Sequence, residues 1–332
     1  MVFKKIINDP YKVVDEMVEG IVLAHSNLLK FANENKRAVI RKDAPIQNKV
    51  GILIGGGSGH EPAFLGYVGK GLADAAAIGN VFASPSPEPI IEATKAINGG
   101  KGVLYMYGNY AGDIMNFDMA AEICQMEDIP IKTVLVTDDI ASAPLDKKKE
   151  RRGVAGDFYV FKIAGAAADK GMDLDEVSRL AEKANDMTIS MGVALGPCSL
   201  PHTLEPSFVL ENNEMEIGLG IHGEAGVRKG NLLTADEITT ELMDKILNEM
   251  NGSKKVSVLI NGLGSTPLME LYIMYRKTYE ILSKNNIEIH SSFVGEYVTS
   301  LEMNGASITI MKLDDELQPL LENEAHCSMF RV

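Results

Sequence analysis

The sequence predicts an α/β protein of two domains, each with a central sheet flanked by helices. Its 332 residues are too many for one ordinary hydrophobic core and suit two domains of about 150 residues each. Short apolar runs rich in β-branched residues alternate with longer helical patterns, as is typical of α/β proteins. The pattern changes near residue 187, and a stretch with several prolines follows, so we expect domains at 1–187 and 188–332.

The first domain opens with apolar residues at nearly helical spacing, which predict a helix over 11–36. Strands are expected at 50–54, 103–106 and 131–136, and helices at 85–96, 113–125 and 173–185. Because strands that alternate with helices are usually parallel, we expect a largely parallel sheet covered on both faces.

The second domain repeats this alternation. An apolar stretch at 188–195 begins it, and strands are expected at 216–221, 256–260, 287–293 and 308–313, with helices at 235–250 and 266–283.

The amino-acid composition limits which kinds of binding partner and which cellular location we expect. The formal charge of −14 argues against nucleic acid or an anionic membrane as the primary partner, because either needs a positive surface. We read no signal peptide and no membrane span, and expect a cytoplasmic protein. Three cysteines without a C-x-x-C pair favour free buried thiols and predict neither disulfides nor a metal site.

A glycine-rich segment, GGGSGHEP at 55–62, follows the expected strand at 50–54 directly. Glycines at the carboxyl end of a strand let the backbone approach a ligand closely, and open α/β sheets bind ligands at that edge. The spacing fits neither G-x-G-x-x-G nor a P-loop, so we expect no bound nucleotide cofactor. A ligand site is favoured here over a turn that only reverses the chain.

Two further segments carry groups that could do chemistry. His222 lies among glycines in GLGIHGEAG at 218–226, where a structural histidine is the alternative to a nucleophilic imidazole. Asp113 closes the segment GNYAGD at 108–113, where a helix N-cap is the alternative to a catalytic carboxylate.

Taken together, the motifs resemble those of the dihydroxyacetone-binding K subunits of dihydroxyacetone kinases, over nearly the whole chain. They are GGGSGHEP (55–62), FASPSP (82–87), NYAGD (109–113), RRGVAG (151–156), GVALGPCSLP (192–201), MEIGLGIHGEAG (215–226) and NGLGSTPLMELY (261–272). The resemblance is to the bacterial type that works with a phosphotransferase system.

The resemblance implies roles for individual residues. His222 would form a hemiaminal with the substrate ketone, His60 would act as acid and base, and Asp113 would be the other catalytic group. The backbone of Gly57, Ser58 and Gly59 would hold the substrate hydroxyls, with Gly108 beside them. Covalent capture of a carbonyl excludes glycerol, which hydrogen bonds alone would discriminate poorly.

The chain departs from the family pattern around the ligand. Gly108 stands where lysine is usual, Ala83 and Ala111 stand where threonine or serine is usual, and Asn80 stands where an acidic residue is frequent. Loss of a cation disfavours phosphoryl transfer, which relies on positive charge near the phosphate. In this respect the chain resembles the paralogues of K subunits that bind the ketone without supporting its phosphorylation and complex a TetR-type regulator. The resemblance implies a ligand sensor that activates the kinase operon through such a regulator.

The alternative is a working kinase subunit that meets an ADP-carrying L subunit recharged by a phosphotransferase M subunit. The resemblance also implies a homodimer. A third hypothesis, a triose-phosphate enzyme, predicts arginine or lysine near the ligand, and 55–62, 108–113 and 218–226 contain neither.

Overall fold

A computed structural model describes residues 4–250 and 252–331. The chain forms two compact units. The unit that we call N-terminal contains Lys5–Val136, Tyr159–Ala184 and the chain from Leu317 onward, and the C-terminal unit contains mainly Thr137–Phe158 and Asn185–Glu316. The expected boundary at 187 lies close to the change at 184/185. Residues 137–158 nevertheless belong with the C-terminal unit and residues from 317 onward with the N-terminal unit, so a single cut does not separate the two.

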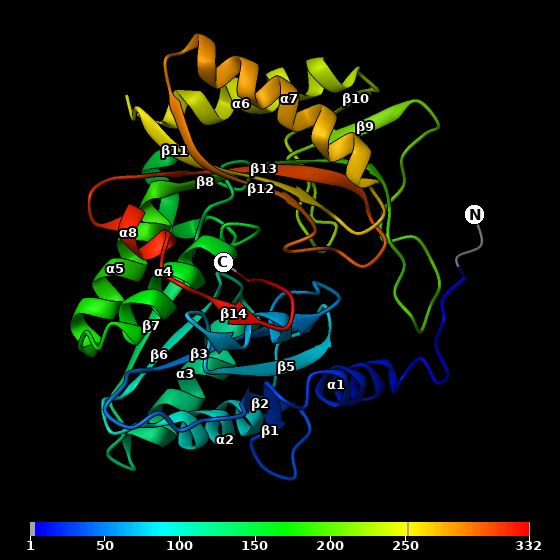
Figure 1. Cartoon of the computed structure of the whole chain (residues 1–332). Coiled ribbons are helices and arrows are strands. Elements are labelled where there is room, and N and C mark those ends of the chain that lie inside the picture. Colours follow the sequence, from blue (N-terminus) through cyan, green and yellow to red (C-terminus); the bar gives the residue numbers. More distant parts are fainter. Residues whose placement is uncertain (1–3, 251, 332) are drawn as a thin grey trace. The chain divides into compact units, whose positions relative to one another are not determined.

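The N-terminal unit is built on a mixed sheet whose strand order is β1-β2-β5-β3-β6-β7 (Figure 1). Its strands are β1 (Leu29–Phe31), β2 (Ala38–Arg41), β3 (Gly51–Ser58), β5 (Ala75–Val81), β6 (Val103–Gly108) and β7 (Ile131–Val136). The four strands from β5 to β7 are parallel, as expected, and β1 and β2 add an antiparallel edge. The carboxyl ends of the parallel strands therefore share one edge of the sheet, which is where open α/β sheets bind ligands.

Several helices lie mainly in the N-terminal unit. They are α1 (Val13–Ala24), α2 (Pro87–Ile97), α3 (Ala111–Gln125), α4 (Asp157–Asp169), α5 (Leu174–Met187) and α8 (Leu317–Leu321). Figure 1 shows α2 and α3 beside each other along the sheet, and their apolar side chains join one buried cluster with side chains of the strands. The two-residue strands β4 (Gly69–Lys70) and β14 (His326–Cys327) pair separately.

The helix expected over 11–36 is half as long as predicted. It ends at Ala24, and residues 29–41 instead form the antiparallel pair β1 and β2, in which Leu29 lies opposite Arg41. Leu29 is only 1% exposed, so burial of its side chain at the sheet edge overrides the helical spacing of the preceding residues.

The C-terminal unit has a second sheet, of order β10-β9-β8-β13-β11-β12. The strands are β8 (Thr188–Gly196), β9 (Glu214–Ile217), β10 (Arg228–Asn231), β11 (Lys255–Gly262), β12 (Glu288–Gly295) and β13 (Asn304–Lys312). In this part of the described chain only β11 and β12 pair in parallel, so the alternation of strands and helices does not produce a parallel sheet here as it does in the N-terminal unit. The reason is that β13 runs back between β8 and β11 and is antiparallel to both.

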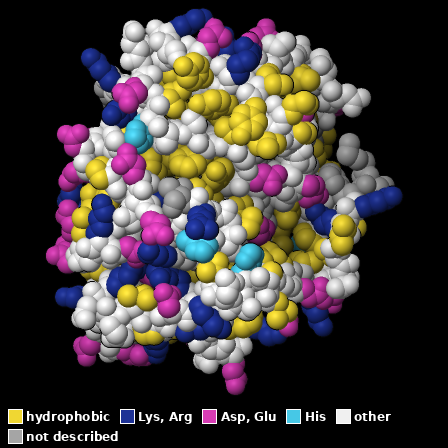
Figure 2. Space-filling model, in the orientation of Figure 1, with side chains coloured by type: hydrophobic (Ala, Val, Ile, Leu, Met, Phe, Trp, Pro, Cys, Tyr) yellow, Lys and Arg dark blue, Asp and Glu magenta, His cyan; other side chains and the backbone are white. Residues whose placement is uncertain are grey.

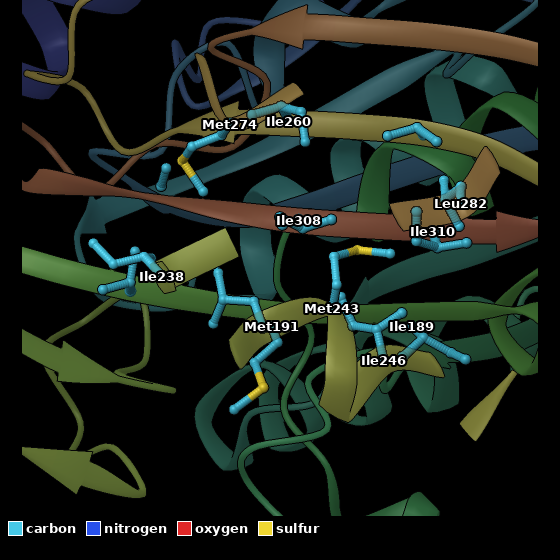
Figure 3. Close-up of a cluster of buried hydrophobic side chains, with 14 of the residues drawn as sticks. Ile189, Met191, Ile238, Met243, Ile246, Ile260, Met274, Leu282, Ile308 and Ile310 are labelled. Atoms are coloured by element: carbon cyan, nitrogen blue, oxygen red, sulfur yellow. The ribbon is translucent and has the colours of Figure 1, made fainter. Parts of the chain in front are cut away.

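Two helices, α6 (Ala235–Glu249) and α7 (Leu268–Lys284), pack together on this second sheet (Figure 1). A capping box between Thr234 and Glu237 begins α6. Figure 3 shows side chains of both helices meeting side chains of the strands in a buried cluster, among them Ile238, Met243, Met274, Ile260 and Ile308. The fold class is thus α/β, with helices packed on a central sheet in each unit.

Exposed apolar side chains lie along one helix of the C-terminal unit. Figure 2 shows hydrophobic side chains gathered over the part of this face where α7 lies, and the exposed apolar residues of α7 include Leu268, Met269 and Tyr272. Among the residues that the structure describes, no helix combines the length and the apolar character needed to cross a membrane.

Candidate functional site

The glycines of GGGSGHEP are required by close packing around the end of β3. A Cβ on Gly55 would lie 2.6 Å from the carbonyl oxygen of Ala77, and a Cβ on Gly57 would lie 2.7 Å from the backbone nitrogen of Ala83. Both distances are shorter than real Cβ contacts. The segment is thus the last part of a buried strand, with neighbouring backbone pressed against it, rather than a simple turn.

The end of β3 is tied to β5 and to the loop that follows β5. The Ser58 hydroxyl donates to the Gly79 carbonyl at 2.8 Å, and the Phe82 N–H donates to the Ser58 carbonyl at 3.0 Å. Gly59, with a φ of +99°, donates its N–H to both carboxylate oxygens of Glu61, at 3.1 and 3.0 Å. The N–H of Gly59 thus already has an acceptor in this structure. Burial raises the pKa of Glu61.

His60 lies in this loop and is only 2% exposed. Its ring stacks on that of Phe82, with centroids 5.0 Å apart and planes 18° from parallel. Phe82 follows β5 and has a φ of +55°, so the chain turns sharply to bring this ring over the histidine. The stack fixes the plane of the imidazole.

Asp113 lies in the first turn of α3, just beyond the end of β6 at Gly108. The N-cap of α3 is Tyr110, so the N-cap alternative for Asp113 is wrong and its side chain is the third of the helix. It is 9% exposed, at the end of the helix where the dipole stabilises negative charge. The loop after β5 also reaches this helix, because Asn116 donates to the Ser84 hydroxyl at 3.2 Å. The structure therefore gathers the predicted groups Gly57, Ser58, Gly59, His60, Gly108 and Asp113 at the carboxyl edge of the parallel strands.

His222 lies in the C-terminal unit, in the loop that follows β9. This loop begins earlier in the chain than expected. Strand β9 stops at Ile217 and does not extend to 221, because Gly218 takes a φ of +76°. The loop is closed by its own backbone: Gly220 donates to the Glu224 carbonyl, and Gly223 donates to the Gly220 carbonyl, each at 3.0 Å. The Ser300 hydroxyl donates to the Ile221 carbonyl.

The Glu224 carboxylate binds His222 twice. Its Oε1 lies 3.0 Å from Nδ1 of the ring, and its Oε2 accepts the His222 backbone N–H at 3.0 Å. Burial acts to raise the pKa of Glu224, but the hydrogen bond and charge of His222 and the charge of Arg152 outweigh it and lower the pKa to about 2. The ionised carboxylate can only accept, so Nδ1 is the donor, and in the neutral form of the ring Nε2 carries the lone pair.

This pairing fixes the orientation of a ring that is accessible from solvent. The side chain of His222 is 25% exposed, so a small molecule can reach the ring. Glu224 was not among the predicted site residues, and the available signal was an acidic residue two positions beyond a glycine-flanked histidine. In the described part of the chain, no cluster of three or more His, Cys, Asp or Glu side chains could hold a metal ion, and Cys124, Cys198 and Cys327 are free thiols.

Comparison with known proteins gives consistent matches along the chain. The Dak1 domain family matches residues 19–329. The dihydroxyacetone-binding subunit DhaK of PTS-dependent dihydroxyacetone kinase 2 from Listeria innocua is 50% identical, over 99% of this chain and 99% of that protein. An L-erythrulose 1-kinase from Mycolicibacterium smegmatis is 44% identical, over 95% of this chain and 56% of that protein. Among solved structures, the dihydroxyacetone kinase operon co-activator DhaQ has a TM-score of 0.88 at 34% identity, over 94% of this chain and 97% of that one.

Proposed function

The chain belongs to the Dak1 family, and from this membership we propose that it captures dihydroxyacetone as a covalent hemiaminal on His222. The observation that carries the proposal is the pair formed by His222 and Glu224. The Glu224 carboxylate accepts from Nδ1 and so places the proton of the neutral ring on that nitrogen, which makes Nε2 the nucleophilic atom of a partly exposed ring.

The chemistry of capture balances without a cofactor. The Nε2 lone pair forms a bond to the ketone carbon, and the electrons of the carbonyl double bond move to its oxygen, which takes up a proton. The imidazole ring becomes positively charged, and the Glu224 carboxylate on Nδ1 stabilises that charge. Glycerol has no carbonyl carbon and cannot react.

Other predicted groups complete the proposal by resemblance to the family. His60 and Asp113 would handle the proton on the substrate oxygen, and the backbone at Gly57, Ser58, Gly59 and Gly108 would hold its hydroxyl groups. The closed loop around His60 supports this assignment, since stacked and hydrogen-bonded groups keep a fixed orientation.

Two candidates exist for the step after capture. The 50% identity to a DhaK subunit across nearly the whole chain favours a kinase subunit, whose captured ketone is phosphorylated by an ADP-carrying L subunit that an M subunit recharges. Gly108 in place of the usual lysine, with the similarity to the co-activator DhaQ, favours a sensor that acts through a TetR-type regulator. In either case the proposed cellular location is the cytoplasm, and the proposed oligomeric state is a homodimer.

Turnover with the cognate L and M subunits separates these candidates. Phosphorylation of dihydroxyacetone at rates that depend on His222 would establish the kinase subunit, and adduct formation without turnover would establish the sensor. Gly108→Lys provides the matched variant. If the missing lysine is what prevents turnover, this substitution should restore part of it.

Intact-protein mass spectrometry under native conditions tests capture itself. The protein is expected to gain one dihydroxyacetone, and His222→Ala is expected to gain none, whereas His202→Ala, at an exposed histidine of the same unit, should behave as wild type. Equal adduct in His222→Ala and wild type would refute the proposal. L-erythrulose should be tested alongside, because a 44% identical relative is a kinase for that ketose.

A further inference from the structure

We propose that Arg152 is a positioning residue for His222, acting through Glu224, and that Asp139 holds Arg152 in place for this role. The inference rests on the proposed capture by His222 and extends it to two residues that do not touch the ring. All four residues belong to the C-terminal unit.

The first link is the pair formed by Arg152 and Asp139. Nε and Nη2 of Arg152 lie 2.9 and 2.8 Å from Oδ2 of Asp139, and the two side chains are 15% and 6% exposed. The backbone joins the same residues, since the Asp139 N–H donates to the Arg152 carbonyl at 3.1 Å. The guanidinium is therefore held by a nearly buried carboxylate and by the backbone beneath it, so it has little freedom to move.

The second link runs from the guanidinium to the His222 loop. Nη2 of Arg152 donates to the Gly218 carbonyl at 3.2 Å, and Nη1 lies 3.9 Å from Oε2 of Glu224. One cation thus reaches the loop at its first residue and at the carboxylate that binds the histidine. Lysine is a poor replacement, because its compact ammonium lacks the planar fork with which the guanidinium spans these separate groups.

Gly220 shows that the loop is shaped around this contact. A Cβ at residue 220 would collide with Oε2 of Glu224 and lie 2.5 Å from Nη1 of Arg152. Any side chain at this position would push the carboxylate and the guanidinium away from the backbone. This glycine is therefore needed for the approach of the two charged groups.

The chemical consequence concerns the proton on His222. The Arg152 charge helps to keep Glu224 ionised against the effect of burial, and an ionised Glu224 can only accept from Nδ1. Without Arg152, the ionised carboxylate loses the cation beside its Oε2 and can turn away from Nδ1, so it no longer fixes the proton on that nitrogen. A larger share of the neutral imidazole then carries its proton on Nε2, where the lone pair is needed for attack.

The first test compares variants in ketone binding and in the state of the ring. In Arg152→Met and in Gly220→Ala, the affinity for dihydroxyacetone is expected to fall about tenfold. The nitrogen-15 spectrum of the six histidines is expected to show a larger share of the Nε2-protonated form of His222, assigned with His222→Ala. Arg276→Met, which removes an exposed ion pair with Asp236 in the same unit, is the control and should change neither.

A double-mutant cycle tests whether Arg152 acts through Glu224. Arg152→Met should weaken binding in the wild type and have no further effect in Glu224→Gln. A purely structural role would lower the melting temperature and give additive losses, with the tautomer of His222 unchanged. Additive losses in the cycle would overturn the inference, and so would an unchanged tautomer of His222 in a folded Arg152→Met. If Arg152→Met does not fold, the same measurements on Gly220→Ala decide the question.

The failure of the two proposals can be told apart. If His222→Ala binds dihydroxyacetone like the wild type, capture by His222 is refuted and the role of Arg152 falls with it. If His222→Ala loses the adduct while Arg152→Met and Gly220→Ala keep wild-type affinity, capture stands and the positioning role alone is refuted.

Discussion

Glu224 holds His222 by two contacts at once, with Oε1 3.0 Å from Nδ1 of the ring and Oε2 accepting the backbone N–H at 3.0 Å. A single carboxylate thereby fixes the ring and the chain that carries it. This relationship explains how a histidine in a glycine-rich loop can present one defined nitrogen to a ligand.

The first prediction concerns Glu224→Gln. The amide keeps the shape of the side chain but no longer stabilises a positive ring, so the affinity for dihydroxyacetone should fall by at least tenfold. The melting temperature should change little, which circular dichroism can check. Wild-type affinity in a folded Glu224→Gln would show that the carboxylate has no part in capture.

The second prediction is a pH dependence of stability caused by Glu224. Its pKa of about 2 lies below the ordinary value of 4.5, so its contribution is fully present above pH 4.5 and is lost as the pH falls through 2. Because the side chain is 36% exposed, we discount the shift for solvent screening and expect about 1 kcal/mol. Urea unfolding at pH 5 and pH 3 should show the larger part of that loss in the wild type relative to Glu224→Gln. A constant difference between the two proteins would contradict it.

The third prediction concerns the stack of His60 on Phe82. Phe82→Ala should lower the free energy of unfolding by about 1 kcal/mol or more, since a stacked ring pair contributes about that much beyond its burial. The looser imidazole should also slow adduct formation, measured as a rate by stopped-flow mixing with dihydroxyacetone. Phe82→Tyr keeps the ring and serves as the control, and equal rates in all three proteins would remove any role of the stack.

The fourth prediction concerns Lys162, which is fully buried in α4 and donates to the carbonyls of Leu320 and Asn323, at 3.0 and 2.7 Å. Burial lowers its pKa to about 8. The unfolded chain therefore holds the proton more tightly between pH 8 and 10.5, and stability should rise across that range by about 3 kcal/mol from this group. The comparison is with Lys162→Met, in which this rise should be missing. The same pH dependence in both proteins would show that the lysine does not titrate in this way.

Local patterns in the sequence were sufficient for most elements of the fold. The strand expected at 131–136 is found at those residues, and the helix expected at 235–250 runs over Ala235–Glu249. Both have strong periodicity and clear boundaries. What local patterns cannot specify is pairing between distant strands, so the antiparallel return of β13 between β8 and β11 went unpredicted.

In the candidate site, too, local patterns predicted some features and could not predict contacts between distant segments. Glycine-rich segments after strands pointed to the loops around His60 and His222, because only particular packing requires several glycines together. The pairing of His222 with Glu224 depends on a tight loop that folds the chain back over two residues. The link from Asp139 through Arg152 joins segments about 70 residues apart in the chain, which no local spacing reveals.

The most direct test of covalent capture is a nuclear magnetic resonance measurement of the new bond. Protein labelled with nitrogen-15 in its histidines would be mixed with dihydroxyacetone labelled with carbon-13 at the ketone carbon. The account predicts a one-bond coupling between that carbon and Nε2 of His222, present in the wild type and missing in His222→Ala. A bound ketone carbon that shows no coupling to His222, or the same coupling in His222→Ala, would contradict it.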